Sequence, residues 1–201
     1  MIAVSDQGPL HYLILIGCDH VLPQLDERVI APRVVIEKEM GDPATPEPVR
    51  TWAANPPPWL EILEPKEVEN IPPLSGKGDR GAGEIAAIAI ARELGTEDLV
   101  ILMDDKRARR EARARGLHPV WTLTVLDEAA ERGLIPDITE RLEHLEQKTP
   151  FRMNRECKAA IESMKQRDRE RKQAREQAQE PEAQSSPEHQ EDPAPEPPGP
   201  G

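Results

Sequence analysis

The sequence contains few aromatic residues and almost no cysteine. Its 201 residues include three Trp, one Tyr, one Phe and two Cys. The core must therefore be built mainly from Leu, Ile, Val and Ala. The two cysteines, Cys18 and Cys157, show no motif spacing. They favour small buried thiols in a reducing compartment over a disulfide.

Long hydrophobic runs are also absent. No apolar stretch approaches the roughly 20 residues of a membrane-spanning helix, and the first residues lack the basic start of a signal or transit peptide. We therefore expect a soluble cytoplasmic protein with no membrane partner. The net charge of −12 argues against nucleic acid as a partner. Because residues 179–201 hold six acids and no Lys or Arg, about half of the excess charge lies in the tail, and the charge weakens a nucleic-acid interpretation without excluding it.

Short apolar runs alternate with helical patterns over residues 1–150, which is typical of a parallel α/β sheet. Residues 99–103 are apolar throughout, as expected for a central strand that is covered on both faces. We predict an α/β domain over residues 1–150, with three α/β/α layers and a central parallel sheet of about five strands. The expected strands begin at Ile2, Arg28, Trp59, Leu99 and Pro119.

The C-terminal part of the chain has a different composition. Residues 151–178 are predicted to form a helical extension, and residues 179–201 an acidic, Pro-rich disordered tail. The apolar positions of the extension stop at Met164. From residue 165 to residue 175 the pattern is charged on every side, so this part of the helix is expected to fray or to project into solvent.

Carboxylates stand at expected strand ends and helix ends. The carboxyl ends of parallel strands meet at one edge of a sheet, where α/β folds place their sites. Acids that are far apart in the sequence can therefore share a pocket. The candidates are Asp6, Asp104 and Asp105 at strand ends, Glu84 at the start of one helix and Glu39 at the end of another.

Such a cluster points to a metal site. Unpaired carboxylates that lie close together repel each other, and a shared proton or a cation relieves the repulsion. Oxygen ligands without His or Cys favour Mg²⁺ or Mn²⁺, which would align a phosphodiester and activate a water molecule for attack. The alternative is that each acid caps a helix or is a solvated surface charge.

A basic segment follows Asp105 directly. If the acids form a site, the first cations of this segment would lie beside it and could hold the phosphates of a polyanion. The alternative is a solvated helix face with internal ion pairs. The candidates for nucleic-acid binding in this segment are Lys106, Arg107, Arg109 and Arg110.

The long loop at residues 64–82 is rich in Pro, Gly and charge, and loops of this length are more often functional than idle. Lys77 and Arg80 are further candidates for phosphate contacts. Residues 76–81 also match G-x-G-x-x-G. Because no buried strand precedes them, we interpret the match as a loop and not as a dinucleotide-binding fingerprint.

Five motifs, in order, resemble those of the PIN-domain family, and more closely its branch of short, uncharacterised bacterial proteins. Each motif alone is weak, whereas five at suitable spacing are fairly specific. The resemblance extends to about residue 165 and includes Phe151-Arg152-Met153 near its end. The motifs are SDQGPL at 5–10, VIEKEM at 35–40, GEIAAIAIA at 83–91, LMDDKRAR at 102–109 and GLHPVWTLTVL at 116–126.

This resemblance implies a Mg²⁺- or Mn²⁺-dependent endoribonuclease acting on RNA. Such proteins are often the toxin of a toxin–antitoxin pair, so a small antitoxin protein and a homodimer are implied as partners. The family's catalytic acids carry over to Asp6, Glu39, Glu84 and Asp105. The implied metal ligands are Asp6, Glu84 and Asp105, with Asp104 as an adjacent substitute.

Two positions depart from the family pattern. Gln7 stands where the family often has Thr, and Met103 where many members have Thr or Ser. The missing hydroxyls would have steadied the surroundings of a metal. A second interpretation therefore stays open, in which the protein is a catalytically weak or degenerate RNA-binding or regulatory module that acts through its C-terminal extension.

Overall fold

The computed structural model describes residues 1–68 and 81–179. Five parallel strands form one sheet, in the order β3-β2-β1-β4-β5. The predicted α/β class and the parallel sheet are confirmed. The strands are β1 (Ile2–Ser5), β2 (Arg28–Pro32), β3 (Leu60–Leu63), β4 (Leu99–Leu102) and β5 (Pro119–Val120).

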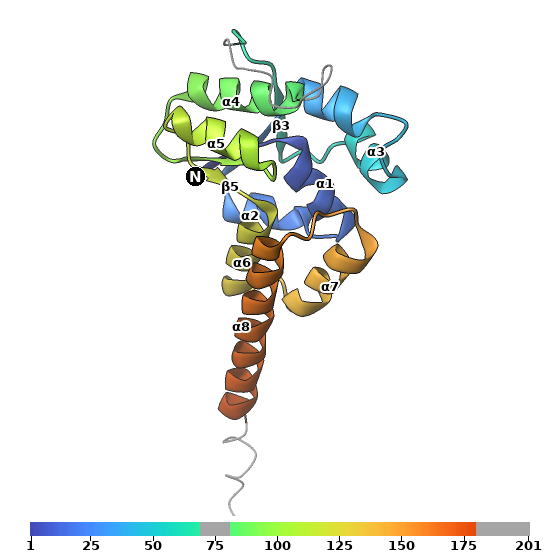
Figure 1. Ribbon diagram of the computed structural model, residues 1–201, viewed down its shortest axis with the longest axis vertical. Helices are drawn as coiled ribbons and strands as arrows, with labels where there is room; N and C mark the ends of the chain where they lie inside the picture. Colours follow the sequence, from blue (N-terminus) through green and yellow to red (C-terminus); the bar gives the residue numbers. More distant parts are fainter. Residues whose placement is uncertain (69–80, 180–201) are drawn as a thin grey trace, which may run out of the picture. The chain divides into compact units, whose positions relative to one another are not determined.

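Helices cover both faces of the sheet, which gives the predicted three layers (Figure 1). Each strand sends alternate side chains to opposite faces. Val100 and Leu102 of β4 pack toward α1 and α6, whereas Leu99 and Ile101 pack toward α4 and α5. The described helices are α1 (Gln7–Leu15), the 3₁₀ segment η1 (Asp19–Val21), α2 (Leu22–Leu25), the π-helical segment η2 (Val35–Met40), α3 (Glu47–Ala54), α4 (Ala82–Leu94), α5 (Lys106–Ala114), α6 (Thr122–Glu131), α7 (Ile138–Lys148) and α8 (Arg155–Gln179).

The order of the strands reverses between β1 and β4. From β1 the chain adds β2 and β3 on one side, and β4 and β5 lie on the other. In open α/β sheets, ligands bind in the crevice at such a point, outside the carboxyl ends of the strands. Ser5 pairs with Leu102, and the Asp6 N–H donates to the Leu102 carbonyl at 3.0 Å. The residues that follow the two strands therefore emerge side by side.

Helix α8 packs further along its length than the sequence pattern predicted. Its apolar contacts end at Met164, but Asp168 is only 4% exposed and accepts a hydrogen bond from Thr139 Oγ1 at 2.8 Å. The prediction that the helix frays or projects from residue 165 is wrong for residues 165–168, because ion pairs replace apolar contacts there. These pairs are Lys165 with Glu146 of α7 and Arg167 with Asp127 of α6.

The chain divides into two compact units, Met1–Asp168 and Arg169–Gly201. In the second unit, residues 169–179 are helical. The predicted division at residues 150 and 178 stays a prediction. Although α8 has 25 residues, none of the helices in the described part of the chain is both long and apolar enough to cross a membrane.

Candidate functional site

Asp6 connects the central strand β1 to helix α1. Its side chain is 5% exposed, and Oδ1 accepts a hydrogen bond from the N–H of Gln7, the first residue of α1. Asp6 is thus a helix cap, as the simpler interpretation expected. It also lines a cavity at the reversal point of the sheet. A structural role and a site role are therefore compatible in the same carboxylate.

Asp104 and Asp105 follow β4 and turn in different directions. Asp104 accepts two hydrogen bonds from Thr122, from N–H to Oδ1 at 2.9 Å and from Oγ1 to Oδ2 at 2.6 Å. Asp105 caps α5, because its Oδ1 accepts from the N–H groups of Arg107 and Ala108 at 2.7 and 2.9 Å. Both acids line the cavity. Asp104 is the less exposed of the two.

The contact between Thr122 and Asp104 should contribute measurably to stability. Thr122 is fully buried, so Thr122→Val would leave a carboxylate oxygen of Asp104 without its hydroxyl donor. We expect the free energy of unfolding to fall by about 1.5–3 kcal/mol in chemical denaturation, because the lost hydrogen bond is to a charged group. The control Thr122→Ser keeps the hydroxyl and should lose about 1 kcal/mol for the missing methyl group. A Val variant as stable as the Ser variant would contradict this role.

Glu39 and Glu84 reach the same region from η2 and α4. Glu39 lies in the π-helical turn, a conformation that occurs frequently at functional sites, and its Oε1 accepts from the Gly83 N–H at 3.0 Å. Gly83 allows this approach, because a Cβ there would lie 2.3 Å from Glu39 Oε2. Glu84 follows directly and faces the cavity. The sequence predicted a helix ending at Glu39 but not its π-helical form.

The carboxylates affect one another electrostatically. Burial raises the pKa of Asp6 well above its usual value, and the negative charges of Glu84, Glu39 and Asp104 raise it further. Burial, with a contribution from Glu84, raises the pKa of Glu39 to about 7. The pKa of Glu84 is raised by burial and by the charge of Asp105. The cluster thus concentrates negative charge that a proton or a cation would relieve.

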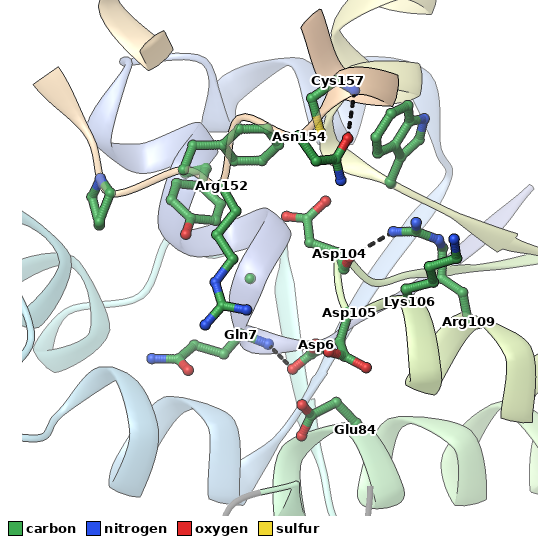
Figure 2. A pocket seen from close by; sticks show the side chains of 15 residues that line it. Asp6, Gln7, Glu84, Asp104, Asp105, Lys106, Arg109, Arg152, Asn154 and Cys157 are labelled. Carbon is green, nitrogen blue, oxygen red and sulfur yellow. Dashed lines mark hydrogen bonds between the residues drawn. The ribbon is translucent and has the colours of Figure 1, made fainter. Parts of the chain in front are cut away.

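A cavity of about 440 Å³ opens over these acids. In Figure 2, Asp6, Glu84 and Asp105 lie at one end of it, Lys106 and Arg109 at one side, and Arg152 extends toward Gln7 and Asp6 from the opposite side. The charge of Glu39 raises the pKa of Asp6, but Glu39 does not line the cavity. Apart from the acids and cations, the wall is made by Gln7, Gly8, Tyr12, Trp121, Pro150, Phe151, Asn154 and Cys157.

The predicted nucleic-acid-binding residues differ in their positions. Lys106 and Arg109 line the cavity. Arg109 is already engaged, since its Nη1 donates to the carbonyls of Met103 and Asp104 at 3.3 and 2.6 Å and its guanidinium lies 5.2 Å from the ring centre of Trp121. The exposed residues Arg107 and Arg110 do not line the cavity, and the loop residues Lys77 and Arg80 lie outside the described residues.

The donor atoms suit a hard divalent cation in their chemistry. Asp6, Glu84 and Asp105 offer carboxylate oxygens to one cavity, which is the ligand type that Mg²⁺ and Mn²⁺ prefer. Within residues 1–68 and 81–179, however, no three Asp, Glu, His or Cys side chains are arranged closely enough to hold a metal ion. The residues therefore fit the ion chemically, but their side chains do not form a coordination sphere in the structure.

Several cavity residues were not selected from the sequence. Tyr12 and Phe151 pack edge to face, with ring centres 4.8 Å apart, and Trp121 and Asn154 complete the same wall. Arg152 is the cation of this wall. The motif Phe151-Arg152-Met153 was the only sequence signal for it. The sequence could not place this motif at the cavity, because that depends on the segment after α7 returning to the carboxyl ends of strands that precede it by many residues.

The fold and the site together define a class of three-layer α/β proteins with an acidic cavity at the carboxyl ends of a parallel sheet. A family model described as a PIN domain matches residues 2–166, and the chain belongs to the PIN-domain family. PIN domains are generally nucleases, so the chain has a nuclease-type fold whose expected substrate is nucleic acid. No curated protein and no solved structure gives a significant match to the chain.

Proposed function

We propose that this protein is a metal-dependent endoribonuclease that cleaves RNA phosphodiester bonds by attack of an activated water. The observation that carries the proposal is the environment of Asp6. Its carboxylate is buried at the reversal point of the sheet, beside an open cavity, and three other acids raise its pKa. Buried like charges are unfavourable unless a ligand compensates them, and such clusters are concentrated at functional sites.

Five acids would take part in the chemistry. Asp6, Glu84 and Asp105 would hold Mg²⁺ or Mn²⁺, with Asp104 next to them. The ion, when bound, would neutralise charge on the phosphate and lower the pKa of a water molecule. Glu39 does not line the cavity, so it would support the chemistry through its negative charge, which raises the pKa of Asp6. Its carboxylate is held in place by the Gly83 N–H.

The cations would hold the substrate. Lys106 stands in the cavity wall at the N-terminus of α5, where it can contact a phosphate next to the acids. Arg109 would mainly position the backbone of residues 103 and 104, to which it already donates. Arg107 and Arg110 are exposed on the same helix and would contact phosphates farther along the RNA. Lys77 and Arg80 remain candidates from the long loop.

Family membership supports a biological role as the toxin of a toxin–antitoxin pair, acting as a cytoplasmic homodimer with a small antitoxin protein as partner. The neighbouring gene is the simplest test of this part. A small adjacent gene with a DNA-binding N-terminus would support the toxin role. Light scattering on the purified chain would measure whether it is a dimer.

The direct test of the activity is RNA cleavage by the purified full-length chain. We expect internal cleavage of single-stranded or structured RNA in the presence of Mn²⁺ or Mg²⁺, and its loss when a chelator is added, because the acids alone repel the phosphate. Activity should return when the metal is restored in excess. The absence of cleavage with either metal, or cleavage that persists with the chelator, would contradict the proposal.

The alternative of a weak or degenerate RNA-binding module is favoured by Gln7. The resemblance calls for a hydroxyl at this position, whereas the Gln7 amide donates to the Glu39 carbonyl at 3.2 Å. Met103 gives less support, because its side chain is buried in the core between the sheet and α4 and α5. Salt-dependent RNA binding without metal-dependent turnover would favour this alternative, as would loss of binding when residues 169–201 are removed.

A further inference from the structure

The connection between α7 and α8 forms the wall of the cavity that faces the acids. Four of its residues line the cavity: Pro150, Phe151, Arg152 and Asn154. This segment lies beyond the last strand, whereas the acids of the cavity follow β1 and β4 or lie at the start of α4. Arg152 is the cation of this wall, and Figure 2 shows its side chain extending toward Gln7 and Asp6.

Hydrogen bonds and packing hold this connection at both ends. On the α7 side, Thr149 Oγ1 donates to the Leu145 carbonyl at 2.7 Å and accepts from the Phe151 N–H at 3.2 Å. Phe151 is buried against Tyr12 of α1. On the α8 side, Asn154 Oδ1 accepts from the Cys157 N–H at 2.9 Å. The backbone of Arg152 is therefore fixed over the cavity before any ligand binds.

The three cations of the cavity are not equivalent. The guanidinium of Arg109 is bound to two backbone carbonyls and stacked on Trp121, so it is already committed. Lys106 lies on the α5 side of the cavity. Arg152 is exposed, and none of the ion pairs found among the described residues uses its guanidinium. Arg152 is thus available to an anion that enters the cavity between it and the acids.

We propose that Arg152 is a substrate-binding residue that holds a phosphate group of the nucleic acid from the wall opposite the acids. A guanidinium presents paired N–H donors that match two phosphate oxygens. The acids at the other end of the cavity repel the same phosphate, and the positive charge of Arg152 offsets part of that repulsion. This inference rests on the proposed function, because it takes the polyanion to be the substrate of the acidic site.

The matched control is Arg155. It lies three residues after Arg152, is exposed in the first turn of α8 and does not line the cavity. Arg152→Ala and Arg155→Ala therefore remove the same charge from the same part of the chain, and only one of them changes the cavity. Both side chains are exposed, so thermal unfolding should show the same melting temperature for both variants as for the wild type.

Binding is measured first, by fluorescence anisotropy with labelled single-stranded RNA in the Asp6→Asn background, without added metal. Relative to Arg155→Ala, Arg152→Ala should weaken binding about tenfold. It should also lower the slope of log affinity against log salt by about 0.7, the value for one lost phosphate contact on a single strand. Arg152→Lys should restore the slope but only part of the affinity, since a point charge replaces the paired donors.

Cleavage is measured second, with metal and an intact Asp6. Arg152→Ala should raise KM more than it lowers kcat, because the contact exists before the chemical step. Equal affinities and salt slopes for the Arg152→Ala and Arg155→Ala variants, or no RNA binding by the Asp6→Asn protein with both arginines intact, would overturn the inference. If the Asp6→Asn protein binds RNA in the predicted Arg152-dependent way but the protein with an intact Asp6 never cleaves it, the phosphate contact stands and the proposed nuclease activity fails.

Discussion

Asp6→Asn should reduce metal-dependent RNA cleavage at least about a hundredfold, because it removes a buried charge that would hold the proposed ion. A bound ion would supply several kcal/mol of charge stabilisation to the transition state. Asn is nearly the same size as Asp, and its side-chain oxygen can still accept from the Gln7 N–H. The cap of α1 and the packing around it should therefore survive. The loss should appear in the rate of cleavage and not in the amount of folded protein.

The pH dependence of the stability of the same variant tests the buried charge of Asp6 independently of cleavage. The folded-state pKa of Asp6 is raised above its usual value by burial and by Glu84, Glu39 and Asp104. An acid whose pKa is raised by folding destabilises the folded state as pH rises through the unfolded value toward the folded one. Asp6→Asn removes this cost. Without metal, the variant should therefore be more stable than the wild type at pH 8, and the difference should shrink at pH 4.

Asp26 provides the matched control. It is also a buried acid, 8% exposed, and burial raises its pKa to about 6, but it lies at the end of α2 and does not line the cavity. Asp26→Asn should therefore share the gain in stability at high pH and leave cleavage unchanged. Full activity in the Asp6→Asn variant, or equal loss in both variants, would remove Asp6 from the proposed site.

The fold could be predicted because its elements are encoded locally. The all-apolar run at β4 and the spacing of strands and helices indicate a parallel sheet without any knowledge of contacts. The positions of Asp6 and of the Asp104–Asp105 pair followed from the same reasoning, since each stands at the end of an expected strand. Parallel strands then place these acids at one edge. The acids could therefore be placed together because the parallel topology of the sheet was predicted.

The remaining features of the site depend on contacts between distant parts of the chain. Consecutive acids cannot be assigned different roles from sequence, yet Asp104 turns to Thr122 while Asp105 caps α5. Arg152 reaches the cavity only because α7 and the connection after it return to the sheet. The packing of Asp168 likewise depends on a partner, Thr139, in another helix. Periodicity reports which residues are apolar, and it does not report which polar residues find partners.

Gly83→Ala should lower the stability of the protein, although replacing Gly by Ala in a helix usually raises it. Replacing Gly by Ala inside a helix normally stabilises it by about 1 kcal/mol. At Gly83, however, a Cβ would lie 2.3 Å from Glu39 Oε2 and 2.8 Å from Val35 Cγ2. Because Val35 is fully buried, the π-helical segment or α4 must move. We expect the free energy of unfolding to fall by about 1–3 kcal/mol, measured by chemical denaturation.

The same substitution should also impair the site, because it displaces Glu39 and with it the hydrogen bond to the Gly83 N–H. A double-mutant cycle separates the two clashes. Combining Gly83→Ala with Val35→Ala should recover part of the stability, whereas combining it with Glu39→Ala should recover stability without restoring cleavage. Independent sites would give additive changes in unfolding free energy, but atoms in contact give a coupling energy of about 0.5–3 kcal/mol. Strict additivity in both pairs would show that Gly83 does not set the distance between η2 and α4, and Glu39 would then owe its position to other contacts, such as those of its carbonyl with Gln7 and Thr45.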